Sequence, residues 1–587
     1  MSSSSQWWKS HGFCVAPGLV TALLGVWSFS QSLPGTDSGP IFREVAREVG
    51  LDFHHFTGAT GEYFFPEIMG SGVGLFDYDG DGDLDVYFLQ GAMLDKTKEM
   101  PQSLFPFSGE APPRNRLFRN DLKEKEALHF TDVTGEAGVG HEGYGMGIAV
   151  GDYNTDGHLD FYVTNAGPNV LYHNNGDGTF RDVTREAGAD DSRFSSSSSF
   201  LDYDSDGDLD LYVTNYVSFT VRGNRKCGET RQDYCSPSVY DPLPDRLFQN
   251  QGNGKFTDIT EKAGLGRAFG AGLGVIAVDL NLDDRPDMYV ANDGTPNQLW
   301  INQGDGTFED LGLISGTAYN IDGVAEAGMG VTAADFDGDG DEDLFVTHNK
   351  KETNTLYLNG REAGFSDATF RFGLANPSVA NTGFGTLGFD YDQDGWLDLF
   401  VANGAVVVDN RQPPESAYPY AQKNQLFRSD GTGRFQEIGA DLAGPALDLV
   451  EVSRGAALGD VDNDGDVDIV IANNNGAARL LLNQVGSRNH WLGVRLRGAG
   501  RSIHAGIYQA RLALIREGQK PLWRRCHSDG SYLSANDSRV FFGLGASPDF
   551  ERVEVYWPDG RCETWNDVRA DQFVTLVRNS GRACASD

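Results

Sequence analysis

Basic residues, cysteines and long apolar runs are scarce in this chain of 587 residues. Lys and Arg total 47 against 85 Asp and Glu, which leaves a formal net charge of −38. Because phosphate backbones and anionic lipids repel such a chain, the charge argues against nucleic acid and membrane surfaces as partners. The six cysteines include no C-x-x-C pair and no Cys/His zinc spacing, so the sequence offers no zinc site.

The apolar run near the N-terminus, about residues 13–29, is interrupted by Pro17 and Gly18 and is short for a membrane span. Lys9 precedes the run and small polar residues follow it, a pattern typical of an export signal. We therefore expect residues 1–33 to be a signal peptide and the mature chain, without a membrane span, to be secreted, periplasmic or on the cell surface. A retained N-terminal anchor is the alternative.

The acidity is concentrated in one nine-residue frame, D-x-D-x-D-G-x-x-D, that occurs seven times and holds 32 of the 85 acidic side chains. Carboxylates at this density repel one another unless a cation lies among them. Oxygen-only ligands on alternate residues of a tight loop suit a hard divalent ion, so we predict up to seven bound Ca²⁺ ions. Glycine occupies position 6 in six frames, where the backbone must turn with a positive φ.

Positions 1, 3, 5, 7 and 9 of each frame are the predicted metal-site residues. They are Asp77, Asp79, Asp81, Asp83, Asp85, Asp152, Asn154, Asp156, His158, Asp160, Asp202, Asp204, Asp206, Asp208, Asp210, Asp279, Asn281, Asp283, Arg285, Asp287, Asp335, Asp337, Asp339, Asp341, Asp343, Asp390, Asp392, Asp394, Trp396, Asp398, Asp460, Asp462, Asp464, Asp466 and Asp468.

Position 7 is expected to offer its backbone carbonyl, so the side chains of His158 and Trp396 need not be ligands. The frame that starts at Asp279 departs furthest from the pattern, because Asp284 replaces the glycine and Arg285 adds a positive charge. We predict that this site binds calcium most weakly or remains empty.

The frame belongs to a longer repeat of four strands. A strand of small residues precedes each frame, an alternating strand such as residues 161–165 follows it, and a third strand ends in Asn, as in 171–174. A Gly-rich turn and a fourth strand close the unit. Seven such units over residues 41–484 predict an all-β fold, a seven-bladed β-propeller. The seventh unit lacks a fourth strand, and residues 41–46 have the matching sequence, so we expect the N-terminal strand to close the ring.

The longest insertions, at about residues 91–113, 216–246 and 404–424, all separate the second strand from the third. They should therefore emerge from one face, with the acidic loops on the other. The inserted face is the first place to look for a partner, an extracellular protein or glycan. The alternative, given equal weight, is that the insertions are loop growth that the fold tolerates and have no binding role. We expect the protein to be a monomer.

Two cysteine pairs are expected in an oxidising compartment. Cys227 and Cys235 lie eight residues apart in one insertion and are predicted to form a disulfide. Cys526 and Cys562 form the second expected pair, and Cys584 is placed in a tail, residues 579–587.

The acidic loop together with Asn-Gly-Asp-Gly-Thr-Phe resembles the FG-GAP/VCBS repeats, which also form the calcium-binding propellers of integrin α-subunits. From residue 488 the motifs Asn489-His490-Trp491-Leu492, residues 530–534 (Gly-Ser-Tyr-Leu-Ser) and residues 553–560 resemble the ASPIC/UnbV domain, assigned to 488–578 as a small β-rich domain. The combination resembles the cartilage acidic protein family. The resemblance implies an extracellular, calcium-binding protein that acts in adhesion or in a matrix.

No catalytic constellation stands out, so we predict a binding module in which calcium is mainly structural. An exported propeller enzyme acting on polysaccharide or another extracellular polymer is the alternative. It would use His54, His55 and Glu67, which precede the first inner strand. A strongly raised pKa of Glu67 in an axial pocket beside His55 would favour the enzyme.

Overall fold

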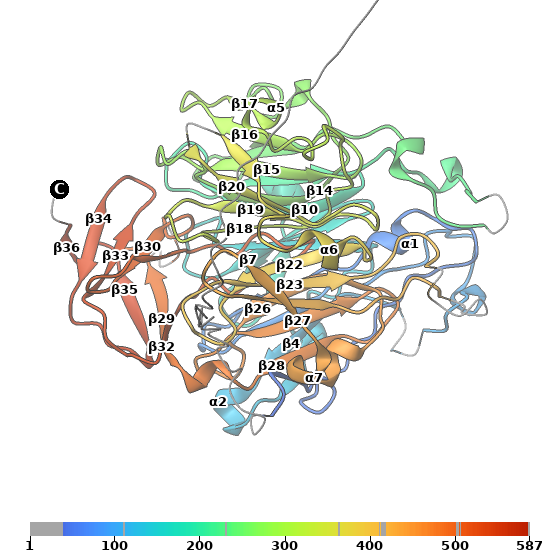
Figure 1. Ribbon diagram of the computed structural model, residues 1–587. Coiled ribbons are helices and arrows are strands. Elements are labelled where there is room, and N and C mark those ends of the chain that lie inside the picture. Colours follow the sequence, from blue (N-terminus) through green and yellow to red (C-terminus); the bar gives the residue numbers. More distant parts are fainter. Residues whose placement is uncertain are drawn as a thin grey trace, which may run out of the picture. The chain divides into compact units, whose positions relative to one another are not determined.

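Four-stranded antiparallel sheets make up most of the chain, as the computed structural model shows (Figure 1). The structure describes residues 39–584, except for 108, 110–111, 229–231, 362–363, 410, 412–417, 500–503 and 505. The predicted signal peptide, residues 1–33, lies outside the described residues, as do 585–587 of the predicted tail. None of the helices in the described ranges has the length and apolar character needed to span a bilayer.

Seven such sheets are found in the described part of the chain. Their strands, grouped by sheet, are β2 (Val73–Phe76), β3 (Asp85–Phe88), β4 (Arg116–Asn120) and β5 (Phe130–Asp132); β6 (Gly145–Gly151), β7 (Asp160–Asn165), β8 (Val170–Asn174) and β9 (Phe180–Asp182); β10 (Ser195–Leu201), β11 (Asp210–Asn215), β12 (Arg246–Asn250) and β13 (Phe256–Asp258); β14 (Gly272–Val278), β15 (Asp287–Asn292), β16 (Gln298–Asn302) and β17 (Phe308–Asp310); β18 (Val331–Ala334), β19 (Asp343–Val346), β20 (Thr355–Asn359) and β21 (Phe365–Asp367); β22 (Gly383–Phe389), β23 (Asp398–Asn403), β24 (Gln425–Ser429) and β25 (Phe435–Ile438); and β26 (Ser453–Gly459), β27 (Asp468–Asn473), β28 (Arg479–Asn483) and β1 (Phe42–Glu44).

The helices are single turns: α1 (Pro66–Met69), α2 (Leu122–Lys125), α3 (Thr134–Ala137), α4 (Thr184–Ala187), α5 (Gly312–Ser315), α6 (Ala375–Ser378) and α7 (Ala440–Ala443).

The first strand of each sheet contacts the first strands of both neighbouring sheets, and the circle closes because β2 contacts β6 on one side and β26 on the other. The last sheet is completed from the opposite end of the chain, since β1 pairs antiparallel with β28, Arg43 opposite Leu482. The all-β prediction and the predicted N-terminal closing strand are therefore confirmed. β1 thus supplies the fourth strand of the last sheet and covers the edge of β28.

One aspartate organises each sheet. The ninth residue of every acidic loop begins the second strand, and its Oδ1 accepts the backbone N–H of the residue that ends the third strand. For Asp210 and Asn250 the N–O distance is 2.8 Å. The same contact holds the other sheets: Asp85–Asn120, Asp160–Asn174, Asp287–Asn302, Asp343–Asn359, Asp398–Ser429 and Asp468–Asn483.

The asparagine in this contact also joins neighbouring sheets. The side-chain amide of Asn250 donates to the backbone carbonyl of Tyr153, in the loop of the preceding sheet, at 2.7 Å. Asn120, Asn174, Asn302, Asn359 and Asn483 make the equivalent bond to the second loop residue of the sheet before them. The sixth sheet departs from this rule because Ser429 has no amide to donate.

Two further sheets form the C-terminal domain. The first contains β29 (His490–Arg497), β32 (Val540–Gly545) and β35 (Gln572–Val577), with β29 and β35 parallel; the second contains β30 (Arg511–Ile515), β31 (Leu522–Arg525), β33 (Arg552–Tyr556), β34 (Cys562–Trp565) and β36 (Arg582–Ala583). One hydrophobic core cluster runs from the second and third propeller sheets into this domain, where it includes Trp557.

The disulfide prediction is right for one pair and wrong for the other. Cys227 and Cys235 are bonded. Cys562 pairs with Cys584, not with Cys526, because β36 pairs antiparallel with β34 and brings the two Cα atoms to 5.4 Å. Cys526 is a free thiol in the domain core, and burial raises its pKa to about 12.

The exceptional serine of the sixth sheet yields a stability prediction. Ser429→Asn keeps an oxygen for the N–H of Gly431, which Ser429 Oγ accepts at 3.3 Å, and adds an amide that faces the carbonyl of Phe336. One recovered hydrogen bond is worth about 1 kcal/mol. We expect the free energy of unfolding in urea to rise by about that amount.

The reverse substitution in an intact sheet, Asn302→Ser, is the control and should lower the free energy of unfolding by at least as much. A destabilised Ser429→Asn protein would show that the amide does not join these sheets.

Candidate metal sites and the axis of the ring

The acidic loops fold around the first carboxylate of each frame. The two oxygens of Asp202 accept the backbone N–H groups of Asp206 and Gly207, at 3.1 and 3.0 Å. The first aspartates of the other six frames accept loop amides in the same way. The repeat therefore folds as one loop geometry, even in the divergent frame at Asp279.

The structure brings predicted ligands together in three loops. Oxygen atoms of three carboxylates lie within 4.8 Å of one another in the sets Asp77, Asp79, Asp85; Asp202, Asp204, Asp206; and Asp335, Asp337, Asp339. Several loop oxygens are buried and have no hydrogen-bond partner among the described residues: Asp81 Oδ2, Asp160 Oδ2, Asp337 Oδ1, Asp392 Oδ1, Asp462 Oδ1 and Asp466 Oδ1. Converging, unsatisfied carboxylate oxygens suit a hard divalent cation.

The pKa values of the loop aspartates also indicate sites for a cation. Burial, and then neighbouring carboxylates, raise the pKa of Asp152 and Asp202 to about 7, and that of Asp77 and Asp335 to about 6, while hydrogen bonds from loop amides oppose the shift. Without a cation, such loops retain protons close to neutral pH. The positive charge of a divalent ion would offset the shift, so these residues fit calcium.

In two loops of the described chain an arginine is paired with a predicted ligand at position 3 or 5. In the fourth loop the Arg285 guanidinium forms an ion pair with Asp283, next to the replaced glycine. In the sixth loop Arg428, from the third strand, lies 2.8 Å from Asp392 and 3.1 Å from Asp394. Arg428 was not among the predicted site residues, although its position directly before the strand's last residue places it over the loop.

The same strand position holds His173 over the second loop, where Asn154 lies 2.9 Å from its Nδ1 and Asp160 3.3 Å away. The Asp160 carboxylate raises the pKa of His173. His158 lies on the surface, and its ring packs on Gly176. Trp396 is 37% exposed and packs on Gly431.

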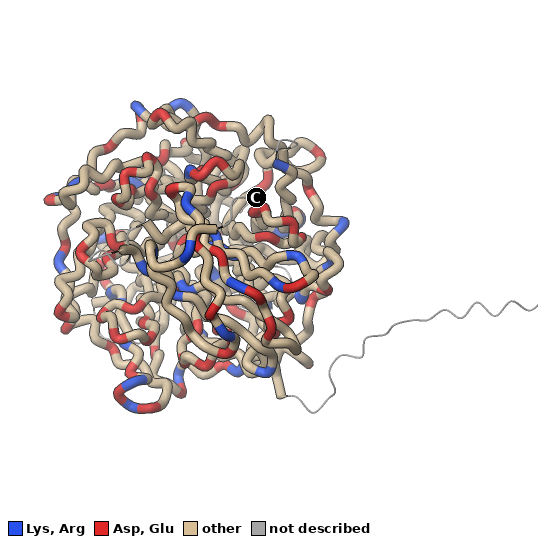
Figure 2. The backbone as a smooth tube through the Cα atoms, turned by 90° about the vertical axis from the view of Figure 1, so that its left-hand side faces the viewer, with Lys and Arg blue, Asp and Glu red and all other residues tan. Residues whose placement is uncertain are grey.

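The C-terminal domain binds the acidic loops through backbone carbonyls. Arg495 donates to Gly82 O at 3.0 Å, Arg524 to Gly395 O at 3.4 Å, and Arg539 to Asp460 O at 2.6 Å, while Arg511 donates to Gly340 O. Figure 2 faces this domain and shows its basic positions among acidic ones. In four of the seven acidic loops a backbone carbonyl thus accepts a hydrogen bond from an arginine of the C-terminal domain.

A segment of the same domain, residues 528–537, fills the axis of the ring. Ser531 pairs with Val331 of β18, and the N–H of Ala535 donates to Val73 O of β2 at 3.0 Å. Tyr532 is completely buried, and its hydroxyl donates to Met69 O at 2.9 Å. A Cβ at Gly72 would lie 1.8 Å from the carbonyl oxygen of Leu533. The small residues of the inner strands therefore make room for this segment.

Glu67 and His55, the candidate catalytic pair, lie outside this axis segment and point to different partners. Glu67 Oε2 accepts the Tyr234 hydroxyl at 3.1 Å, and His55 Nδ1 accepts the N–H of Asn475 at 3.0 Å. Burial raises the pKa of Glu67 to about 8 and lowers that of His55 to about 3. No hydrogen bond or ion pair joins the two side chains in the described part of the chain.

The three insertions meet on one face, as predicted. Asp233 of the second insertion accepts the N–H of Val408 and the hydroxyl of Tyr420, both of the third and both at 2.8 Å. Phe105 of the first insertion packs edge-on against Tyr418 of the third. The insertions thus cover this end of the ring as one assembly.

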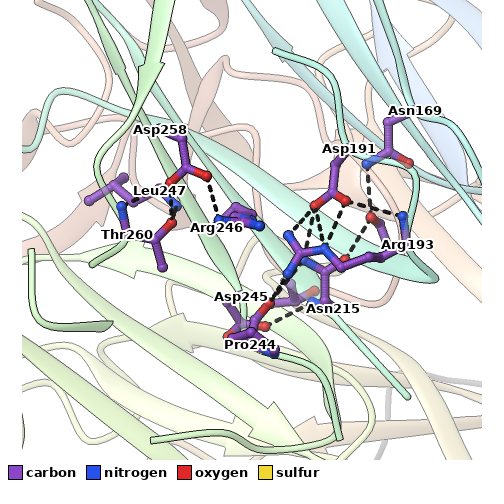
Figure 3. A network of polar contacts seen from close by, with 12 residues as sticks. Asn169, Asp191, Arg193, Asn215, Pro244, Asp245, Arg246, Leu247, Asp258 and Thr260 are labelled. Carbon is purple, nitrogen blue, oxygen red and sulfur yellow. Dashed lines mark hydrogen bonds and ion pairs between the residues drawn. The ribbon is translucent and has the colours of Figure 1, made fainter. Parts of the chain in front are cut away.

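Near these insertions, the second strands end in a contact that resembles the one at the loops. In five sheets a side-chain amide oxygen accepts the backbone N–H at the end of the second strand, as Asn169 does from Asn165 at 2.8 Å. In the third sheet Asp245 takes this place and accepts from Asn215 at 2.8 Å (Figure 3). The neighbouring Arg193 is paired with Asp191, so Asp245 has no ion-pair partner among the described residues. Burial raises the pKa of Asp245 to about 7.

This exception leads to a pH prediction. Folded Asp245 keeps its proton up to about pH 7, whereas the unfolded chain loses it near pH 4, so between these values the native state binds more protons and this group's contribution to stability falls as pH rises. Asp245→Asn removes that dependence. We expect its free energy of unfolding, relative to the natural chain, to rise by up to about 1.4 kcal/mol per pH unit over this interval.

Urea unfolding of both proteins at pH 5 and pH 8, at one calcium concentration, measures the difference. Asp190→Asn, an exposed position, is the control. A difference that is independent of pH would contradict a protonated Asp245.

The comparisons with known proteins cover both parts of the chain. Residues 503–583 match the family described as ASPIC and UnbV, and residues 152–213, 279–346, 335–401 and 390–471 match the FG-GAP-like repeat. Cartilage acidic protein 1 of Homo sapiens is 29% identical over 331 residues, which cover 54% of this chain and 45% of that protein. The Xenopus tropicalis protein is 28% identical over 316 residues, covering 52% and 45%. The match thus spans about half the length of these relatives.

Solved structures with a similar arrangement are more distant. An Agrocybe aegerita lectin described as recognising non-reducing terminal N-acetylglucosamine is 14% identical, with a TM-score of 0.35 over 70% of this chain and 87% of its own. Rhamnogalacturonan lyase YesW is 13% identical, with a TM-score of 0.28 over 71% and 90%. Scores this low carry no argument about function.

The FG-GAP-like repeats, the ASPIC and UnbV domain after them and the relatives that match across half of the chain confirm the resemblance seen in the sequence: the chain is similar to the cartilage acidic proteins.

Proposed function

We propose that the chain is an exported calcium-binding module that binds an extracellular protein or glycan and in which calcium is mainly structural. The observation that carries the calcium proposal is the convergence of three carboxylates within 4.8 Å in the loops at Asp77, Asp202 and Asp335. The two disulfides fit an oxidising compartment. The family relationship supports an extracellular role.

In each loop, the carboxylate or amide oxygens of positions 1, 3 and 5 and the carbonyl of position 7 would hold the ion. Bound calcium would supply positive charge at a strand turn where the chain gathers negative charge. In six loops the ninth aspartate accepts backbone amides with both oxygens, as Asp210 does from Tyr203 and Asn250, so it also orients the loop. In the second loop, Asp160 Oδ2 has no such partner among the described residues.

The fourth and sixth loops are the weakest of the proposed sites. Arg285 and Arg428 already neutralise carboxylates that calcium would need, and a cation entering either loop must displace or tolerate the guanidinium. The ion pair of Arg285 supports the prediction that the site at Asp279 binds calcium most weakly. The ion pairs of Arg428 lead us to expect weak calcium binding in the loop at Asp390 as well.

The magnitude of the effect favours a structural role. With a Kd of ~10⁻⁴ M, within the range of extracellular modules, and ~2 mM calcium, each site would stabilise the fold by roughly 1.8 kcal/mol. Seven independent sites would contribute ~12 kcal/mol, similar to the whole stability of a domain. The loops also carry the contacts that join one sheet to the next.

Calcium removal tests the proposal. We expect a chelator to lower the melting temperature of the full chain sharply and calcium to restore it, measured by calorimetry. Asp202→Asn should reduce the calcium-dependent rise more than the matched Asp279→Asn, because the latter lies in the loop with the internal arginine. An unchanged melting temperature in chelator would overturn the structural role.

The alternative, an exported propeller enzyme acting on polysaccharide, is favoured by one observation. A carboxyl with a pKa of about 8, as for Glu67, is protonated at neutral pH and suits a general acid. However, Glu67 is 1% exposed, and residues 528–537 fill the axis where a polymer would enter. A glycan and protein array at fixed calcium separates the two, since an enzyme would shorten a bound polysaccharide and a binding module would not.

A further inference from the structure

A cavity of about 420 Å³ lies on the inserted face, beside the buried axis segment. Its walls are largely apolar: Phe65, Ile68 and Met69 from α1 and its start, Val217 from the second insertion and Val407 from the third. It is thus formed by the same insertions that the sequence analysis singled out as the place for a partner. Its volume is that of a small-molecule or side-chain pocket.

Two carboxylates interrupt the apolar wall. Asp293 is 8% exposed, and its Oδ2 accepts the hydroxyl of Tyr216. Glu352 Oε2 accepts the backbone N–H groups of Ala327 and Asn349, both at 3.1 Å. Asp293 Oδ1 and Glu352 Oε1 accept no hydrogen bond from the described residues. Each carboxylate therefore has one oxygen without a hydrogen-bond partner among the described residues, and both side chains belong to the wall of a largely apolar cavity.

No cation of the described chain neutralises this pair. Ala327, whose N–H binds Glu352, forms a backbone bridge with Asp293, so the two acids flank one residue. Lys350, close in sequence, forms its ion pair with Asp409 at 3.2 Å. Burial lowers the pKa of His348 to about 4, so this neighbour of Glu352 is uncharged at neutral pH. A buried carboxylate such as Asp293 is normally paired, and leaving it without a cation is costly, while Glu352 beside it is partly buried.

Aromatic rings form part of the same cavity. Phe65 stacks on Tyr216, with ring centroids 5.4 Å apart, and lies 5.6 Å from the ring of Tyr240. Phe65 and Tyr240 both line the cavity. Aromatic faces attract organic cations, and apolar walls accept an alkyl stem but not a hydrated metal ion.

We infer that this cavity binds an organic cation: an ammonium or guanidinium group on an apolar stem, held between Asp293 and Glu352. Such a group is carried by free amines and by the Lys or Arg side chains of a partner protein. The inference deepens the proposed binding function by naming the chemistry of the partner. The net charge of −38 would attract a cation to the protein as a whole.

The test is calorimetry of the full chain in millimolar calcium at physiological ionic strength, with n-pentylamine as ligand and n-pentanol as its neutral analogue. We expect one site for the amine and none for the alcohol. Glu352→Gln keeps acceptors for its two backbone N–H groups and should weaken amine binding by about ten-fold or more, the cost of removing one charged partner. Glu309→Gln, an exposed position on β17, is the matched control and should leave binding unchanged.

A second variant avoids the buried groups. Val407 is 48% exposed and lines the cavity, so Val407→Trp should obstruct it without changing a charge.

A peptide with one lysine, compared with the same peptide carrying norleucine, distinguishes a protein side chain from a free amine. Tighter binding of the lysine peptide than of pentylamine assigns the site to a protein partner.

Equal binding of pentylamine and pentanol, or a Glu352→Gln protein that binds like the control, would overturn the inference. If either result is found while calcium still raises the melting temperature, the inference about the cavity fails and the calcium proposal stands. Failure of the inference can therefore be distinguished from failure of the calcium proposal.

Discussion

The contact on which the propeller depends is a hydrogen bond between one aspartate and one backbone amide, repeated in every sheet. The ninth residue of each acidic loop holds the end of the third strand, and the asparagine at that strand end holds the preceding loop. The loop that gathers negative charge is therefore also the joint between sheets. Its carboxylates cannot be exchanged for neutral residues to relieve repulsion without weakening the ring, which gives a physical reason for neutralising them with a cation instead.

The C-terminal domain contacts both the acidic loops and the axis of the ring. Its arginines bind the carbonyls of four loops, and residues 528–537 replace solvent along the axis. The Gly and Ser residues of the inner strands, including Ser195–Ser199 in β10, provide the space, and Ser197 and Ser199 also bind Leu533 and Asp529. With the axis filled, the proposed binding function is assigned to the inserted face, where three insertions pack on one another beside the cavity lined by Asp293 and Glu352.

Much of this was predictable because the repeat is local. The frame, its four strands and the missing fourth strand of the last unit could be read within about 60 residues each, and the pairing of β1 with β28 follows from them. The axis segment could not, since nothing in residues 530–535 indicates that Ser531 and Ala535 pair with strands 200 and 461 positions earlier. Cys584 was missed because β36 is two residues long, and Arg428 because its loop lies 30 residues before it. Asp245 was visible, as an acid where five other sheets have an amide, but only once the sheets were aligned.

Closure of the ring by its own N-terminus has a consequence for biosynthesis. β1 is made first, and its partner β28 follows roughly 440 residues later, which at 5–20 residues per second corresponds to roughly 20–90 seconds of translation. During that time β1 has no partner strand, so it is available to pair with nascent chains translated from the same mRNA. Delivery across a membrane before folding would postpone that exposure to a compartment where the last sheet, the axis segment and both disulfides can form together.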